Sequence, residues 1–198
     1  MTMSKFKIIA PLYEQMLRFS SLGEKRTPNG TMLYGKAPHV GSKAFLHTLY
    51  MPLTDDEVLS LGKIIRKKIP EHLANLYREC NGLHYFVDTF SIDGLRIGSG
   101  RNFDTFYQPY DLATPNIDER PRDAEDNLIF FGGYDWDGSL FYTKTNEKKV
   151  YWCSSDSSKP LKIWESIEDF IFHEANRIAA LFDSHGIILN ADKSPLSI

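Results

Sequence analysis

Apolar residues recur at helical spacing in four stretches of the chain. Each stretch places them three or four positions apart, as one buried helix face requires, and the four lie at residues 12–22, 54–65, 70–80 and 166–182. The second begins with Thr54 and Glu57, the spacing of a capping box, in which the two residues satisfy free backbone N–H groups reciprocally. Ser166 and Asp169 open the last stretch in a similar way. Glycines follow three of these predicted helices and supply their ends: Gly23, Gly82 and Gly186.

Shorter apolar runs predict strands in the rest of the chain. They lie at residues 45–51, 84–92, 127–134, 139–144 and 149–155. The turn dipeptides Asp137-Gly138 and Asn146-Glu147 separate the last three, which indicates an antiparallel meander. The run at 45–51 is expected as an edge strand closed by Pro52. Glycine, proline and charged residues dominate two further segments, which we predict to be loops: residues 23–43 and 104–127.

Length and composition are those of one ordinary globular domain. The chain has 198 residues, of which 42% are hydrophobic and 25% charged. No apolar run approaches the roughly 18 residues of a membrane span, and the first residues do not make a signal peptide. Cys80 and Cys153 have no metal-binding spacing, so they are expected to be free, buried thiols in a reducing compartment. We therefore expect a cytoplasmic protein with no membrane association.

Charge is distributed unevenly along the sequence. Residues 1–70 contain eleven Lys and Arg against five Asp and Glu, whereas residues 88–147 contain five against twelve. The acidic segment, residues 88–147, is also rich in Tyr and Phe. An acidic, aromatic surface would attract a basic partner and repel nucleic acid. This pattern favours a protein partner over DNA or RNA.

Motifs for metal or catalytic chemistry are incomplete. Residues 135–138, "DWDG", resemble part of a calcium loop, but Gly133 and Lys144 stand where ligands are needed. His173 is followed by Glu174, as in a zinc-protease helix, yet position 177 is Arg instead of the second His. We expect no metal, no cofactor and no enzymatic activity.

Three segments in order resemble the SUKH superfamily, which includes bacterial immunity proteins against polymorphic toxins and a fungal cell-wall-synthesis regulator. They are "LGKIIRKKIPEHLANLYRECNGL" (61–83), "LIFFGGYDWDGSLFY" (128–142) and "KVYWCSSD…WESIEDFI" (149–156 and 164–171). The resemblance implies an α+β fold, in which helices pack on one side of a curved, largely antiparallel sheet of about six strands. It divides the chain into an N-terminal extension packed on the core (1–53), a SUKH-like domain (54–183) and a C-terminal tail (184–198).

The resemblance also implies a cytoplasmic immunity protein that binds a cognate toxin, often a nuclease, without catalysis or a cofactor. Nuclease active faces are basic because they hold polyanions, so an acidic surface suits such a partner. The carboxylates expected to make contact are Asp118, Glu119, Asp123, Glu125, Asp135 and Asp137. The aromatic anchors expected beside them are Tyr107, Tyr110, Tyr134 and Trp136.

Structural roles are the alternative for several of these residues. Tyr134 and Trp136 can simply pack on the sheet, and Asp137 can serve only its turn. At the level of function, the alternative is a regulatory interaction module that scaffolds a cytoplasmic complex without a toxin. A hydrolase based on the carboxylate-rich loop would require a metal or a deep pocket with converging carboxylates.

Overall fold

A computed structural model describes residues 6–98 and 107–190 of the chain. Predictions that touch other residues lie outside the described part. These are the first residues of the N-terminal extension, the start of the loop predicted at 104–127 and most of the C-terminal tail.

The fold is built on one open sheet of nine antiparallel strands that follow one another in chain order. Helices and strands combine as the α+β class requires, so the predicted fold class is confirmed, but the expected count of about six strands was too low. The strands are β1 (Glu24–Arg26), β2 (Met32–Lys36), β3 (Phe45–Leu49), β4 (Leu83–Tyr85), β5 (Phe90–Ile92), β6 (Leu128–Gly133), β7 (Leu140–Lys144), β8 (Val150–Cys153) and β9 (Lys162–Trp164).

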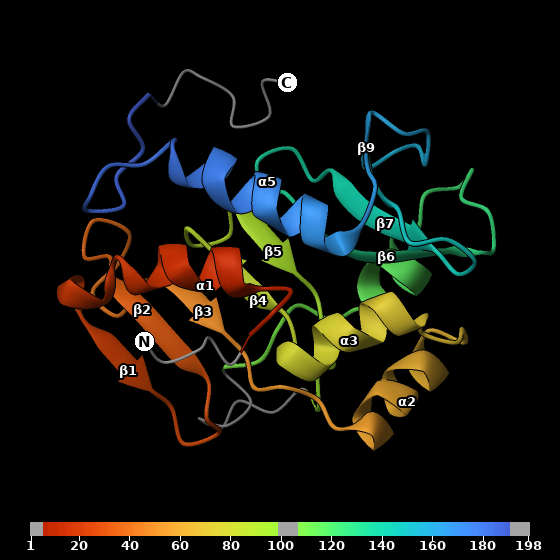
Figure 1. Ribbon diagram of the computed structural model, residues 1–198, viewed down its shortest axis with the longest axis horizontal. Helices are drawn as coiled ribbons and strands as arrows, with labels where there is room; N and C mark the ends of the chain where they lie inside the picture. Colours follow the sequence, from red (N-terminus) through yellow and green to blue (C-terminus); the bar gives the residue numbers. More distant parts are fainter. Residues whose placement is uncertain (1–5, 99–106, 191–198) are drawn as a thin grey trace.

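Four α-helices contribute to the main core. They are α1 (Ala10–Leu17), α2 (Asp55–Ile64), α3 (Glu71–Glu79) and α5 (Ile167–Ala179). Figure 1 shows α1 and α5 side by side in front of the sheet, with α3 and α2 beside them. Both predicted caps are present, because Thr54 and Glu57 form the capping box and Ser166 Oγ accepts a hydrogen bond from the Asp169 N–H.

Successive side chains of a strand point to opposite faces of the sheet, so the central strands contribute apolar residues to two layers. In β6, Ile129 and Phe131 belong to the main core with the helices, whereas Leu128 and Phe130 point to the opposite face. That second face carries a smaller cluster, which Ala124 of the connection before β6 helps to cover. The connection is anchored by Asn116, which is in the short helical turn η2 (Thr114–Asp118) and exchanges hydrogen bonds with the Phe130 backbone. Both faces of the central sheet are therefore buried.

The N-terminal segment contains strands where the sequence predicted loops. β1 and β2 lie within residues 23–43, and they place β3 inside the sheet, so the prediction of an edge strand at 45–51 was wrong. The signal is hidden because β1 is a polar edge strand and β2 is interrupted by Gly35 at φ +71°. A Cβ atom at Gly35 would approach Leu46 and Phe19 to 2.9 Å, so glycine is required there.

Two other boundaries differ from the prediction. The run at 84–92 is two strands joined by a turn in which Phe86 and Val87 both have positive φ. The last helix ends at Ala179, so Phe182 lies beyond it and stacks on the Phe86 ring at 4.0 Å between centroids. In both places the apolar spacing predicts one continuous element, but contacts with distant residues end that element earlier.

Candidate functional site: two interaction surfaces

The β6–β7 turn presents an exposed aromatic ring between two carboxylates. Asp135, Trp136 and Asp137 are all exposed, and Trp136 is 52% accessible. The turn is held internally, since Gly138 N donates to the Tyr134 carbonyl (3.1 Å) and Ser139 N donates to Asp137 Oδ1 (2.9 Å). Asp137 thus has the turn role that the sequence left open, while its exposed carboxylate still faces solvent.

Tyr134 is the buried support of this turn and not an exposed anchor. Its side chain is 4% accessible, and its hydroxyl donates to Glu174 Oε2 of α5 and accepts from Arg177 Nη2 at 3.0 Å. Arg177 also binds both oxygens of the fully buried Glu174 carboxylate. Burial is the main cause that raises the pKa of Tyr134, and the Glu174 charge adds to it. Tyr134 thus has the structural role that was its alternative, and its polar group is used inside the fold.

Sheet register brings the β4–β5 turn to the same end of the sheet as the β6–β7 turn. Ser91 pairs with Gly133, so Asp88, three residues before Ser91, lies beside the start of the β6–β7 turn. His84 Nδ1 lies 2.5 Å from Asp88 Oδ1, and the ring of Tyr110 lies 4.4 Å from the His84 ring. The hydrogen bond from His84 is the main cause that lowers the pKa of Asp88.

Tyr110 joins the two turns into one surface. Its side chain is 41% accessible. Burial is the first cause that raises its pKa; the charge of Asp88, a hydrogen bond with Asp88 and, more weakly, the charge of Asp135 add to it. We call this surface the acidic rim, and its residues are Asp88, Tyr110, Asp135, Trp136 and Asp137.

Sequence reasoning missed Asp88. It stands in a strand-like run, and the packing of Tyr110 on His84 and its backbone contact with Gly94 bring it next to Tyr110. No local signal could have placed it there.

The other predicted contact residues do not belong to the rim. Glu125 precedes β6 at the end opposite the turn, and a six-residue strand spans about 20 Å. Asp123 accepts hydrogen bonds from Ser157 Oγ (2.7 Å) and Ser158 N (2.8 Å), which hold the segment after β8. Tyr107 is half-buried, and its carbonyl accepts a hydrogen bond from Asn29 Nδ2.

Asp118 and Glu119 are exposed where η2 ends. Of the six predicted carboxylates, Glu125 thus lies at the other end of β6 from Asp135 and Asp137.

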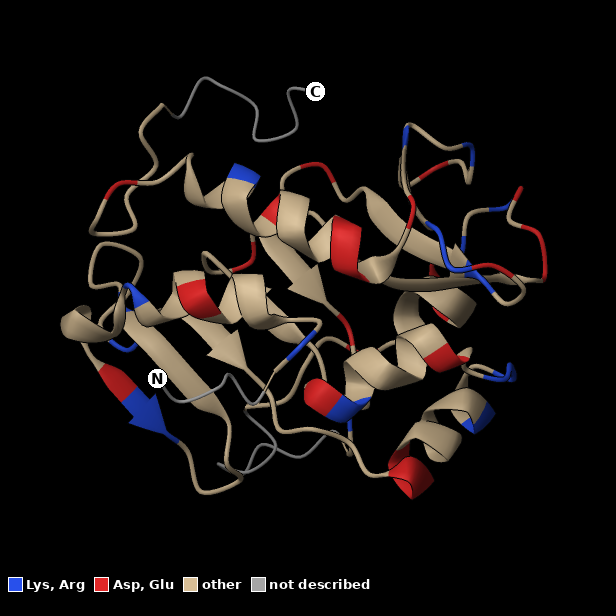
Figure 2. Cartoon of the chain, viewed as in Figure 1, with Lys and Arg blue, Asp and Glu red and all other residues tan. Residues whose placement is uncertain are grey.

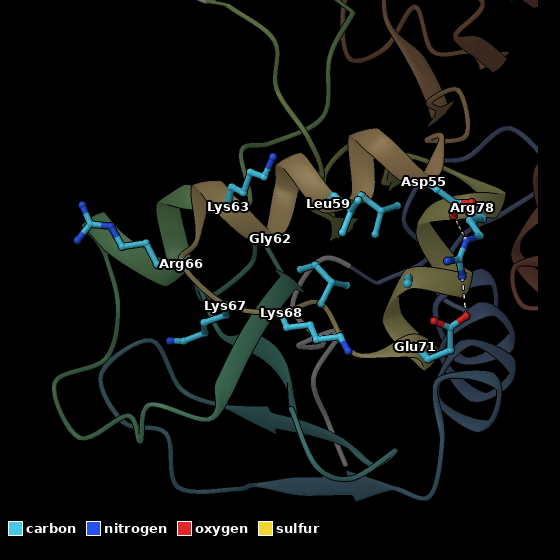
Figure 3. A pocket seen from close by; sticks show the side chains of 12 residues that line it. Asp55, Leu59, Gly62, Lys63, Arg66, Lys67, Lys68, Glu71 and Arg78 are labelled. Atoms are coloured by element: carbon cyan, nitrogen blue, oxygen red, sulfur yellow. Dashed lines mark hydrogen bonds and ion pairs between the residues drawn. The ribbon is translucent and has the colours of Figure 1, made fainter.

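A second candidate surface is a hollow of about 550 Å³ between α2 and the start of α3. We call it the basic hollow. Its lining residues are Asp55, Val58, Leu59, Gly62, Lys63, Arg66, Lys67, Lys68, Ile69, Glu71, Ala74 and Arg78. Lys63, Arg66 and Lys67 lie toward the end of the hollow where α2 stops, and Lys68 lies between that end and Glu71, as Figure 3 shows. Figure 2 shows the same group in blue, whereas the β6–β7 turn carries red residues.

The end of α2 fixes the backbone that carries these cations. Lys67 N donates to the Gly62 carbonyl (2.9 Å) and Arg66 N donates to the Lys63 carbonyl (3.2 Å), which is the Schellman pattern. Arg66 occupies the left-handed position at φ +56°, where glycine is usual. Gly62 has no room for a side chain, because a Cβ atom there would lie 2.7 Å from the Lys67 carbonyl oxygen.

The two ends of the hollow differ in charge. At the far end, Arg78 Nε binds Asp55 Oδ1 (2.8 Å) and Arg78 Nη1 binds Glu71 Oε1 (2.7 Å), so one cation is shared by two carboxylates there and one negative charge is left over. Within residues 6–98 and 107–190, none of the four cations takes part in an ion pair. Burial, followed by the charge of Arg120, lowers the pKa of Lys67. The sequence signal was the run "KIIRKK" at 63–68, which the charge count for residues 1–70 included but did not single out.

In the part of the chain that the structure describes, no three His, Cys, Asp or Glu side chains approach closely enough to hold a metal ion. Cys80 and Cys153 are both buried and free, as predicted. Over the same residues, no helix is both long and apolar enough to span a membrane.

The fold and its surfaces define a class: an open antiparallel α+β domain that offers charged surfaces for contact. A family model of the SMI1 / KNR4 family (SUKH-1) matches residues 52–173, and the chain belongs to this family. The predicted SUKH relationship is thus confirmed. No curated protein and no solved structure matches the chain significantly.

Proposed function

We propose that the chain is an immunity-type protein, which neutralises a cognate toxin by stoichiometric contact through the acidic rim. Membership of the SUKH-1 family is consistent with an immunity role or with a regulatory role. The observation that favours direct contact is Trp136, a half-exposed indole ring between two exposed carboxylates on a turn fixed by hydrogen bonds. Large aromatic side chains near the centre of an interface commonly dominate its binding energy.

Rigidity of the turn supports this role physically. Binding costs less conformational entropy when the contacting segment already has its bound shape. Tyr134, Glu174 and Arg177 hold the start of the turn to α5, and the Asp137 side chain closes its other end. Trp136 therefore projects from a fixed platform, as expected for a residue that inserts into a partner.

Charge on the rim suits a nuclease-type toxin. Such an enzyme holds a polyanion, so its active face carries Lys and Arg. Asp88, Asp135 and Asp137 would attract that face over a distance of about 8–10 Å at physiological salt. Long-range attraction speeds association, whereas the ring of Trp136 would slow dissociation.

Co-expression with the toxin domain encoded by the adjacent reading frame tests the proposal. The wild-type chain should rescue growth and co-purify with the toxin in a stoichiometric complex. Trp136→Ala should weaken the complex about 30-fold or more, as expected for a central aromatic residue. Phe172→Ala is the matched control, because Phe172 is a similarly exposed ring (56% accessible) on α5 and is not one of the rim residues. Calorimetry would supply both affinities, and equal losses for the two variants would contradict the rim assignment.

Asp137→Asn separates charge from structure within the same turn. Asparagine retains an oxygen that accepts the Ser139 N–H hydrogen bond, so the turn should persist while one negative charge is lost. Association should slow about two- to fivefold, and raised salt should reduce the difference. Rescue by a chain that forms no complex with the toxin would refute neutralisation by contact and leave the regulatory module as the function.

A further inference from the structure

The basic hollow combines an aliphatic surface with cations that form no ion pair among the described residues. Val58, Ile69 and Ala74 are buried at its base, while Leu59 stands in its wall with 62% of its surface accessible. Isolated exposed apolar side chains are common, but here Leu59 adjoins a recess lined by further aliphatic groups. A complementary ligand would bring an aliphatic group and negative charge together.

Positive charge is distributed unevenly along the hollow, so a charged ligand should bind in one orientation. Arg78 is already engaged by Asp55 and Glu71 at one end, so the positive potential comes from Lys63, Arg66 and Lys67 toward the other end and from Lys68 between the two. Lys67 and Lys68 directly precede Ile69, whose side chain lies at the base. A ligand whose carboxylates flank an aliphatic side chain would satisfy both features at once.

Nucleic acid is a poorer match for the same surface. Single-stranded DNA and RNA are usually held by cations together with aromatic rings on which the bases stack. No aromatic side chain lines the basic hollow among the described residues. Aliphatic groups beside lysines instead suit a peptide, in which leucine or isoleucine provides the apolar contact.

We propose that the basic hollow binds an acidic segment of a partner protein, with an aliphatic side chain of the segment against Val58, Leu59 and Ile69 and its carboxylates facing Lys67 and Lys68. This site is separate from the acidic rim and requires a partner of opposite charge. It therefore goes beyond the proposed neutralisation of a basic toxin, and either proposal can hold without the other.

Selection from a displayed library of random twelve-residue peptides tests this site. The immobilised full-length chain should enrich sequences with several Asp or Glu residues around one Leu, Ile or Val. Counter-selection on the Lys67→Glu/Lys68→Glu double variant should remove them. The matched control, Lys36→Glu/Lys43→Glu, changes net charge equally at two exposed lysines on β2 and the following loop. Failure to enrich acidic sequences, or equal loss with the control, would overturn the proposal.

Fluorescence polarisation with one selected peptide then separates the two contributions. K67E/K68E should weaken binding about tenfold or more, and replacing the Glu residues of the peptide by Gln should do the same. Replacing the aliphatic residue of the peptide by Ala should weaken binding about tenfold. Leu59→Ala should weaken it about threefold, whereas Leu161→Ala, at a similarly exposed leucine before β9 (54% accessible), should have no effect.

Two other occupants would give distinct results. A twelve-nucleotide single-stranded DNA that binds more tightly than the selected peptide, and loses binding in K67E/K68E, would show a nucleic-acid site. Self-association of the wild-type chain that K67E/K68E abolishes in sedimentation would show that a second copy occupies the hollow. Either outcome would refute the acidic-segment proposal.

Discussion

The acidic rim and the basic hollow differ in shape as well as in charge. The rim projects, since its central ring stands on a two-strand turn at the end of the sheet. The hollow is recessed between two helices, and Lys63, Arg66, Lys67 and Lys68 are among the residues that line it. A projecting surface is suited to enter a partner's cleft, whereas a recessed one is suited to receive a partner's side chain. One small domain can thus present two surfaces that select partners of opposite charge.

The residues that hold the acidic rim in place are buried in the core, whereas those that hold the basic hollow belong to one surface helix. The rim rests on the buried Tyr134–Glu174–Arg177 group, which links the sheet to α5. The hollow rests on local features of α2, namely its capping box at Thr54 and its Schellman end at Arg66. Damage to the rim's support should therefore destabilise the whole domain, whereas changes at the hollow should act locally. The following predictions address this contrast.

The largest effect is expected for Glu174→Ala. Removing this fully buried carboxylate takes away the acceptor of the buried Tyr134 hydroxyl and the ion-pair partner of Arg177 in this group. Loss of one partner from a buried ionic group costs about 3–5 kcal/mol. Urea denaturation should show this decrease in the free energy of unfolding.

Tyr134→Phe is the graded control for this group, because it removes only the hydroxyl and should cost about 1–2 kcal/mol. Peptide binding at the basic hollow should stay unchanged in Tyr134→Phe, while binding at the acidic rim should weaken. A stability loss below 1 kcal/mol for Glu174→Ala would contradict the assigned role of the group.

A second difference concerns pH. Burial, with the Asp111 charge as a lesser cause, raises the pKa of Asp93 from 3.8 to about 7. Asp93 follows β5 and precedes Gly94, whose N–H binds the Tyr110 carbonyl beside the rim. The unfolded chain releases this proton near pH 4 and the folded chain only near pH 7. The contribution of Asp93 to stability is therefore fully present below about pH 4 and is lost as pH rises to 7.

Asp93→Asn should remove this pH dependence. At pH 8 the variant should be more stable than the wild type by about 2–4 kcal/mol, and the difference should vanish below pH 4. Unfolding free energies measured across this range check the prediction. A constant difference between wild type and Asp93→Asn at all pH values would show that Asp93 does not titrate in this window.

The sequence predicted those parts of the molecule in which local signals agree with the fold. Thr54 with Glu57 and Ser166 with Asp169 marked two helix starts, because capping depends on residues three positions apart. The β6–β8 meander was predicted from its turns and alternation. β1 and β2 were missed, because pairing with β3 and not local propensity makes them strands.

Less of the two candidate surfaces could be predicted, because their residues are brought together by strand pairing and by contacts with residues far apart in the sequence. Asp135, Trp136 and Asp137 could be proposed because an Asp-Gly turn is exposed. Burial of Tyr134 depends on Glu174, forty positions away, and no local pattern indicates that contact. Asp123 and Glu125 looked equivalent to Asp135 in sequence, but the length of β6 separates Glu125 from the turn.

The smallest effect is expected for Arg66→Gly. This variant tests whether Arg66 contributes to binding while it lowers the stability of the fold. An Arg residue at φ +56° is strained, because its Cβ atom crowds the backbone in the left-handed region. Arg66→Gly should relieve this strain and raise the free energy of unfolding by about 0.5–1 kcal/mol, after allowing for the greater entropy of glycine in the unfolded chain. The same variant should weaken the acidic peptide about threefold, because one of the four cations is lost. Arg66→Lys is the matched control, since it keeps both the charge and the strain and should change neither property. Thermal unfolding and peptide titration of the three proteins would decide the point: a gain in stability without any loss of peptide affinity would mean that Arg66 takes no part in binding at the hollow.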